Sequence, residues 1–90
     1  MTDILSQTPA ASTSQHDAIV ELSMRRDLAK RMGGIWIQKA AAEFVHARTV
    51  KDAGDLTAAK DLERRGMSYQ QRATECWSAV AQFNRILLEM

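Results

Sequence analysis

KDAGD, residues 51–55, is the one convincing break in a long stretch of helix-favouring sequence, and it decides the fold. Lys51 suits the last turn of a helix, because the negative end of the helix dipole attracts a cation. Gly54 suits the left-handed position just past a helix, and Asp55 or Thr57 can cap the next one. The pattern predicts that one helix ends and a second begins within these residues.

The sequence on both sides of this break favours helices. No proline follows residue 15, and good helix formers such as Ala, Leu, Arg and Gln dominate. We predict a first arm over about residues 16–53, a loop over about 52–55 and a second arm over about 55–90. Arms of equal length joined by a short loop are typical of a long antiparallel helical hairpin, so the expected fold class is all-α.

The second arm has the clearest periodicity. Uncharged residues follow one another at spacings that alternate between three and four: Ala59, Leu62, Gly66, Tyr69, Ala73, Cys76, Val80, Phe83 and Leu87. Such a heptad seam predicts the packed face of a long helix in a coiled coil. Cys76 lies on this seam, so we expect a buried small hydrophobe rather than a nucleophile.

The first arm is less regular, and its apolar stripe shifts at Gly33-Gly34. The stripes are Leu22, Ala29, Met32 and Trp36, with Met24, Leu28 and Ile35 beside them, and then Ile37, Ala40, Phe44 and Ala47. Adjacent glycines cost a helix roughly 1–2 kcal/mol relative to alanine. A kink at Gly33-Gly34 that gives three helices is therefore the alternative to a simple hairpin. Folding the arms back about the loop brings Met32 near Cys76 and places residues 41–42 opposite Gly66.

Residues 1–14, MTDILSQTPAASTS, differ in composition from the rest of the chain. They are rich in Ser, Thr and Ala, contain the only proline and offer little to bury. We interpret them as a flexible N-terminal tail that precedes a single helical domain over residues 15–90. A peptide that docks on a partner through Ile4 and Leu5 is the alternative.

Composition and charge exclude several classes of protein. The chain has 90 residues, enough for one domain, and no run approaches the roughly 18 apolar residues of a membrane span. Twelve Lys and Arg against eleven Asp and Glu leave a net charge of +1, which is not the footprint of a nucleic-acid-binding protein. One cysteine cannot form an internal disulfide, and no basic residue precedes Arg25 to mark a signal peptide. We expect a cytoplasmic protein.

The residues that could carry chemistry do not form a site. His16, His46 and Cys76 lack metal-ligand spacing and are not expected to converge in a hairpin. No glycine-rich phosphate loop is present, and capping explains the acidic residues at the break. Glu43 and Glu75 have basic residues within one turn and indicate solvated faces. We expect no enzymatic activity, no cofactor, no metal and no small-molecule substrate.

Nucleic-acid binding is the alternative function. Residues 28–33, LAKRMG, resemble the first helix and turn of a helix-turn-helix motif, which implies DNA recognition. Lys39 stands where the second helix of that motif has a branched apolar residue. A basic helical face could bind RNA instead, through Arg25, Arg26, Lys30 and Arg31 or through Arg64 and Arg65, although acidic residues interleave these positions.

Two further resemblances concern helix packing. One stretch of the chain resembles a single tetratricopeptide-type helix-turn-helix, which has small residues where its two helices touch. The residues that carry this resemblance are Ala47, residues 54–56, Ala59 and residues 66–67. His46 and Glu63 depart from that pattern, because the family has large apolar residues there. In size and layout the chain also resembles the hairpin subunits and co-chaperones of bacterial type III secretion systems.

Bulky apolar residues gather at the end of the expected hairpin opposite the loop, and Trp77, Ala81 and Leu88 form a stripe beside the seam. A two-helix hairpin has one contact face and cannot cover both stripes alone. We therefore expect an interaction module, such as an adaptor, co-chaperone or inhibitor-like regulator. Its expected partner is a second copy, in a dimeric helical bundle, or another protein, and a compact three-helix monomer is the alternative.

The predicted partner-binding residues are large and apolar: Leu28, Trp36, Trp77, Phe83, Leu87 and Leu88. The tryptophans are the expected anchors, because large aromatics tend to dominate binding energy. A charged rim that sets orientation more than strength is expected from Arg25, Arg26 and Arg85.

Overall fold

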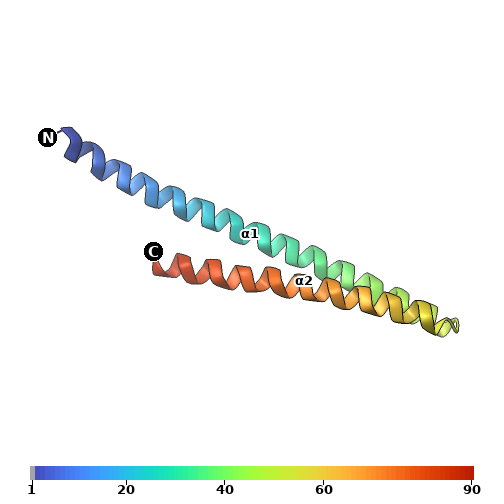
Figure 1. Ribbon diagram of the computed structural model, residues 1–90. Helices are drawn as coiled ribbons and strands as arrows, with labels where there is room; N and C mark the ends of the chain where they lie inside the picture. Colours follow the sequence, from blue (N-terminus) through green and yellow to red (C-terminus); the bar gives the residue numbers. More distant parts are fainter. Residues whose placement is uncertain (1) are drawn as a thin grey trace.

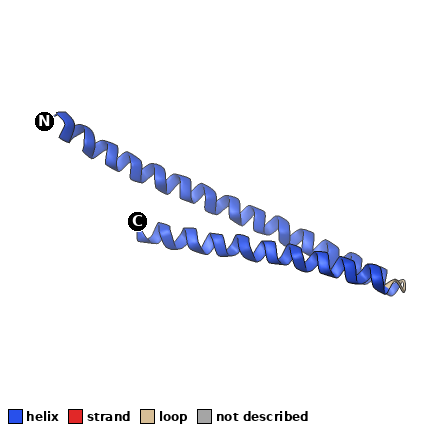
Figure 2. Cartoon of the chain, viewed as in Figure 1, coloured by secondary structure: helices blue, strands red, loops and turns tan. Residues whose placement is uncertain are grey.

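Two long helices pack side by side and antiparallel in the computed structural model (Figures 1 and 2). The structure describes the backbone of residues 2–90 and the side chains of residues 14–90. Helix α1 spans Thr2–Asp52 and helix α2 spans Leu56–Glu89, and no strand occurs over residues 2–90. The predicted all-α hairpin is confirmed. The side chains of residues 1–13 lie outside the described part of the structure. The flexible tail predicted for residues 1–14 therefore stays a prediction.

The connection between α1 and α2 has the chemistry that the sequence predicts. Gly54 has a φ of +95°, in the left-handed region that glycine adopts without strain. Its N–H donates to the Lys51 carbonyl at 2.9 Å, and the Asp55 N–H donates to the Val50 carbonyl at 3.1 Å. The Asp55 carboxylate accepts from the Ala58 N–H at 3.1 Å and caps α2. Both helix ends at the loop are therefore capped by local hydrogen bonds.

Helix α1 runs through Gly33 and Gly34 without interruption, so the predicted kink into three helices is wrong. Gly33 is buried against α2, where a Cβ would lie only 3.1 Å from the Trp77 indole. The close approach of the helices holds α1 straight despite the low helix propensity of glycine. Residues 28–33 share this continuous helix, so the turn of the proposed helix-turn-helix does not exist.

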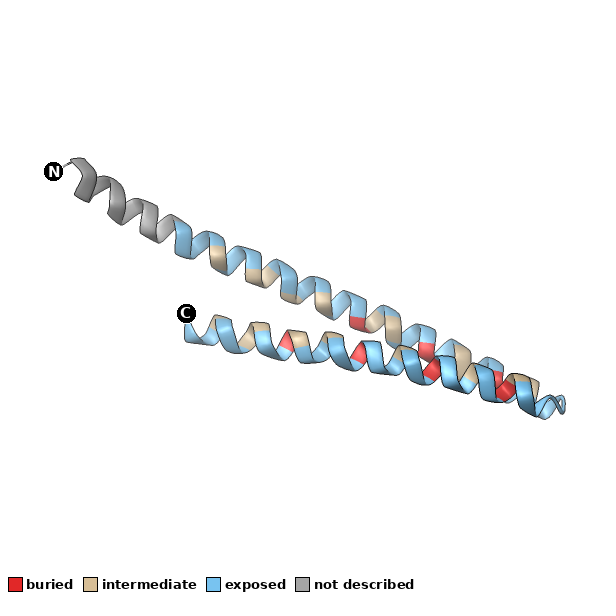
Figure 3. Cartoon of the chain, in the orientation of Figure 1, coloured by how far each residue is buried: buried red, intermediate tan, exposed pale blue. Residues whose placement is uncertain are grey.

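Small residues make the buried interface, and on each helix they recur every seven positions (Figure 3). They are Gly33, Ala40 and Ala47 on α1, and Ala59, Gly66, Ala73 and Val80 on α2. Seven residues is the period of a coiled coil. Because these side chains are so short, the two backbones can approach closely.

The seam of α2 is the one that the sequence predicts, since each of its nine expected residues is buried or half-buried. The seam of α1 differs from the prediction, because it does not shift at the glycines. Half-buried residues complete this seam: Leu22, Arg26 and Ala29 before Gly33, Trp36 and Glu43 between the buried residues, and Val50 after Ala47. Arg26 and Glu43 are charged and Gly33 has no side chain, so a search for apolar periodicity passes over all three.

Contacts across the seam fix the register of the helices. The Arg26 guanidinium donates to Asn84 Oδ1 at 3.3 Å near one end, and the Trp36 and Tyr69 rings stack in the middle. The expected position of residues 41–42 opposite Gly66 is wrong, because both residues are exposed. The Phe44 ring covers Gly66 instead, only 2.9 Å from where a Cβ would stand.

Candidate interaction surface

The hairpin has its small residues inside and its large apolar residues outside. Among residues 14–90, the buried hydrophobic side chains belong only to Ala40, Ala47, Ala59, Ala73 and Val80. The exposed large ones are Ile19, Val20, Met24, Leu28, Met32, Ile35, Ile37, Val45, Leu56, Met67, Trp77, Ile86, Leu88 and Met90. Full burial of one such side chain is worth about 1.5–3 kcal/mol, so burial against a partner would add hydrophobic stabilisation that the hairpin does not gain by itself.

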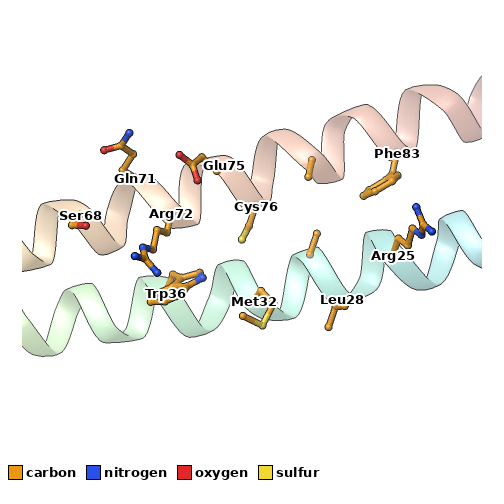
Figure 4. Close-up of a pocket in the computed structure, with 12 residues that line it drawn as sticks. Arg25, Leu28, Met32, Trp36, Ser68, Gln71, Arg72, Glu75, Cys76 and Phe83 are labelled. Carbon is orange, nitrogen blue, oxygen red and sulfur yellow. The ribbon is translucent and has the colours of Figure 1, made fainter.

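An open groove of about 810 Å³ runs between the helices on one face (Figure 4). Both helices line it, with Arg25, Leu28, Ala29, Met32 and Trp36 from α1 and Ser68, Gln71, Arg72, Glu75, Cys76, Ala79 and Phe83 from α2. Ala29 and Ala79 are too small to fill the space between the helices, which leaves the hollow. Met32 and Cys76 both line this groove, one from each helix.

An apolar strip on the outer side of α1 continues this groove. Met24, Leu28 and Ile35 follow at spacings of four and seven, which places them on one side of the helix. Leu28 belongs to both the groove and the strip, and 56% of its surface is exposed. A second hollow of about 530 Å³ includes Met24 and Leu28 in its lining. The groove and the strip together form one apolar surface.

Trp36 closes the loop-proximal end of the groove and is already covered by neighbours. Its ring stacks on Tyr69 with centroids 5.5 Å apart. The Arg72 guanidinium carbon lies 4.8 Å from its centroid, and Lys39 Nζ lies 5.1 Å from it. Cations over an indole face are attracted by its quadrupole. A ligand in the groove would therefore meet Trp36 and Arg72, which both line it, and Lys39 lies against the same indole just outside the lining.

The structure separates the two predicted anchors. Trp77 does not line the groove, because it follows the buried Ala73 by four positions and lies on the other flank of the seam. Its indole packs across Gly33, and 45% of the residue is exposed. Leu88 is exposed and also lies apart from the groove. Of the predicted partner-binding residues, the groove brings together Leu28, Trp36 and Phe83.

Leu87 and the predicted charged rim fall at different places. Leu87 is half-buried on the seam. Arg25 lines the groove and pairs with Glu21 at 2.7 Å. Arg26 is a seam residue rather than a rim residue, since it bonds to Asn84 and only 28% of its side chain is exposed. Arg85 is exposed and has no ion pair among the described side chains.

Two charged residues have roles that the sequence does not reveal. Glu43 is interpreted from sequence as part of a solvated face, yet its Oε2 is buried without a hydrogen bond and lies 3.7 Å from Arg65 Nη1. Arg72 has Glu75 one turn away, yet it lies over Trp36 instead. In both cases the deciding contact crosses from one helix to the other, so spacing along a single helix could not find it.

Over the described residues, neither helix has the length and apolar composition that a membrane crossing requires. Within the same residues, no three His, Cys, Asp or Glu side chains gather where they could hold a metal ion. The sequence matches no protein-family model, and comparisons with curated proteins and with solved structures found no similar chain.

Proposed function

We propose that the protein is a small interaction module without enzymatic activity, which binds another chain through the groove and the adjoining α1 strip. One observation carries this proposal: among residues 14–90 the buried hydrophobic side chains are small, while fourteen large apolar side chains are exposed. A hairpin of this size has little core of its own, so burial against a partner would add the missing hydrophobic contact. Adaptor, co-chaperone and inhibitor roles all fit this activity.

Two occupants of the surface follow from the sequence. A second copy would give a dimeric four-helix bundle, and a different protein would contribute one or more amphipathic helices. Light scattering over a dilution series separates them, because a dimer doubles the mass and dissociates on dilution.

The surface itself is tested by Leu28→Ala and its matched control Val45→Ala. Both residues are exposed on α1, Val45 at 68%, but only Leu28 lines the groove. We expect Leu28→Ala to weaken self-association, or binding of a designed amphipathic helical peptide, by about tenfold, because anchors near the centre of an interface cost most when truncated. Val45→Ala should leave the affinity unchanged. Equal effects of the two substitutions, or a folded monomer that binds no amphipathic peptide, would contradict the proposal.

A further inference from the structure

Two cations converge on one indole at the loop-proximal end of the groove. Arg72 comes from α2 and Lys39 from α1, and each lies about 5 Å from the Trp36 centroid (4.8 and 5.1 Å). Their charges are therefore within about one Debye length of each other, roughly 8–10 Å at physiological ionic strength. Bringing like charges this close has a free-energy cost that a nearby anion would remove.

These two cations lack a carboxylate partner, as six other Lys and Arg side chains of residues 14–90 do, and they are the two that lie against an aromatic ring. Arg25, Arg26, Arg64 and Arg65 each lie within 4.0 Å of a carboxylate. Neither Lys39 nor Arg72 has such a partner among the side chains of residues 14–90. Glu75 lines the groove near Arg72, but Figure 4 shows Arg72 directed toward Trp36 and Glu75 directed away from it. This end of the groove is therefore positively charged.

The rest of the groove is mostly apolar, with Ser68, Gln71 and Glu75 on its α2 side and Arg25 at its far end, and it is long enough for a helix. On α1 its lining runs from Arg25 to Trp36, about 16 Å at 1.5 Å per residue, or roughly three helical turns. Leu28, Met32 and Phe83 lie along this length. A surface with these features suits a helix whose apolar residues recur at i, i+4 and i+7.

The geometry points to a partner of defined chemistry: an amphipathic helix that carries Asp or Glu one turn beyond its apolar residues, with that carboxylate bound by Arg72 and Lys39 over Trp36. This inference rests on the proposed function, because it specifies what the same groove binds. A carboxylate here forms charge-assisted hydrogen bonds with both cations, and the guanidinium can bind it through two N–H groups.

Charge complementarity favours such a partner over a second copy. An isologous interface places one patch against the same patch of the other subunit. With groove facing groove, the end that carries Lys39 and Arg72 meets either itself or the end that carries Arg25. In the first arrangement positive charge opposes positive charge, which is unfavourable. In the second, Glu21 and Asp27 are already paired with Arg25 and Arg26, so that end offers Lys39 and Arg72 no unpaired carboxylate.

The test uses three fluorescein-labelled helical peptides of about five turns, with leucines at i, i+4 and i+7 and with Glu, Gln or Lys one turn further on. Fluorescence anisotropy with the full chain gives their affinities. We expect the Glu peptide to bind about five-fold more tightly than the Gln peptide and more tightly again than the Lys peptide, with a difference that shrinks as salt rises. The preference should vanish in the Lys39→Gln, Arg72→Gln double variant.

A matched double variant, Lys60→Gln and Arg64→Gln, removes the same charge from exposed positions of α2 that do not line the groove, and it should keep the preference. Equal affinity of the three peptides for the unmodified chain would overturn the inference and leave the proposed function standing. Failure of all three to bind a chain that light scattering shows to be a folded monomer would overturn both, and failure to bind a dimer would overturn the inference alone. Binding of a single-stranded RNA oligonucleotide that depends on Lys39 and Arg72, without a peptide preference, would make the site one for phosphates and would also overturn the inference.

Discussion

The loop-proximal part of the hairpin and its open end differ in how closely the two helices pack. Near the loop the seam is closed by buried Ala40, Ala47, Ala59 and Gly66. Over residues 14–32 and 81–90, at the end opposite the loop, no residue is buried, and larger ones such as Leu22 and Phe83 reach only half-burial (Figure 3). The difference teaches that small residues bring these helices together, while large ones leave an apolar surface for a partner.

The largest expected effect on stability comes from a substitution in the closely packed seam near the loop. Gly66→Leu should lower the free energy of unfolding by about 3 kcal/mol, because even a Cβ would lie 2.9 Å from the Phe44 ring. Gly34→Leu is the control, since a Cβ at Gly34 meets nothing within 4 Å. It should stabilise α1 by up to about 1 kcal/mol through helix propensity. Urea unfolding followed by circular dichroism measures both, and a similar loss in the two variants would refute the assignment of Gly66 to a closed seam.

A smaller effect is expected where the closed part gives way to the open one. Trp77→Ala removes an indole that packs across Gly33, and we expect the free energy of unfolding to fall by about 2 kcal/mol, less than for a fully buried tryptophan. Affinity for a peptide in the groove should change little, because Trp77 lies on the other flank. A large loss of affinity at unchanged stability would instead restore Trp77 as an anchor, as the sequence suggests.

The smallest expected effect on stability comes from replacing the one charged residue in the closely packed seam near the loop. Glu43 is a charged interruption of the α1 seam, with 21% of its side chain exposed and a buried oxygen that accepts no hydrogen bond. Glu43→Met should raise the free energy of unfolding by about 1 kcal/mol, because an unsatisfied buried oxygen is replaced by a thioether. The side chain of Arg65 is 57% exposed and can be solvated without Glu43. A lower melting temperature would show that the ion pair stabilises the hairpin.

The sequence predicts much of this fold because the relevant signals are local. Gly54 and Asp55 mark the turn by backbone chemistry, and the α2 seam is a run of uncharged residues with heptad spacing. The α1 seam escapes prediction because it includes the charged residues Arg26 and Glu43. Only their partners on α2 explain why they lie at the interface. Physical pairing across the interface, rather than periodicity within one helix, selects these positions.

The candidate surface is predicted in part for the same reason. Leu28, Trp36 and Phe83 are apolar, and their type alone marks them as candidates. Whether Trp36 and Trp77 share a face depends on the rotation of α1, since each residue turns a helix by about 100°. The rotation of α1 follows from the position of Gly33 in the seam, which the apolar pattern does not show. The sequence alone therefore cannot place the two tryptophans on different faces.

The repeat of small residues along both helices has a mechanical consequence. Because similar side chains recur every seven positions, α1 could slide along α2 by one repeat, about 10 Å, and still meet short side chains. The tight turn at Gly54 and the two aromatic plugs, Phe44 on Gly66 and Trp77 beside Gly33, oppose such a slip. The alanines allow close packing in more than one register, and the turn and the two aromatic contacts select one of them.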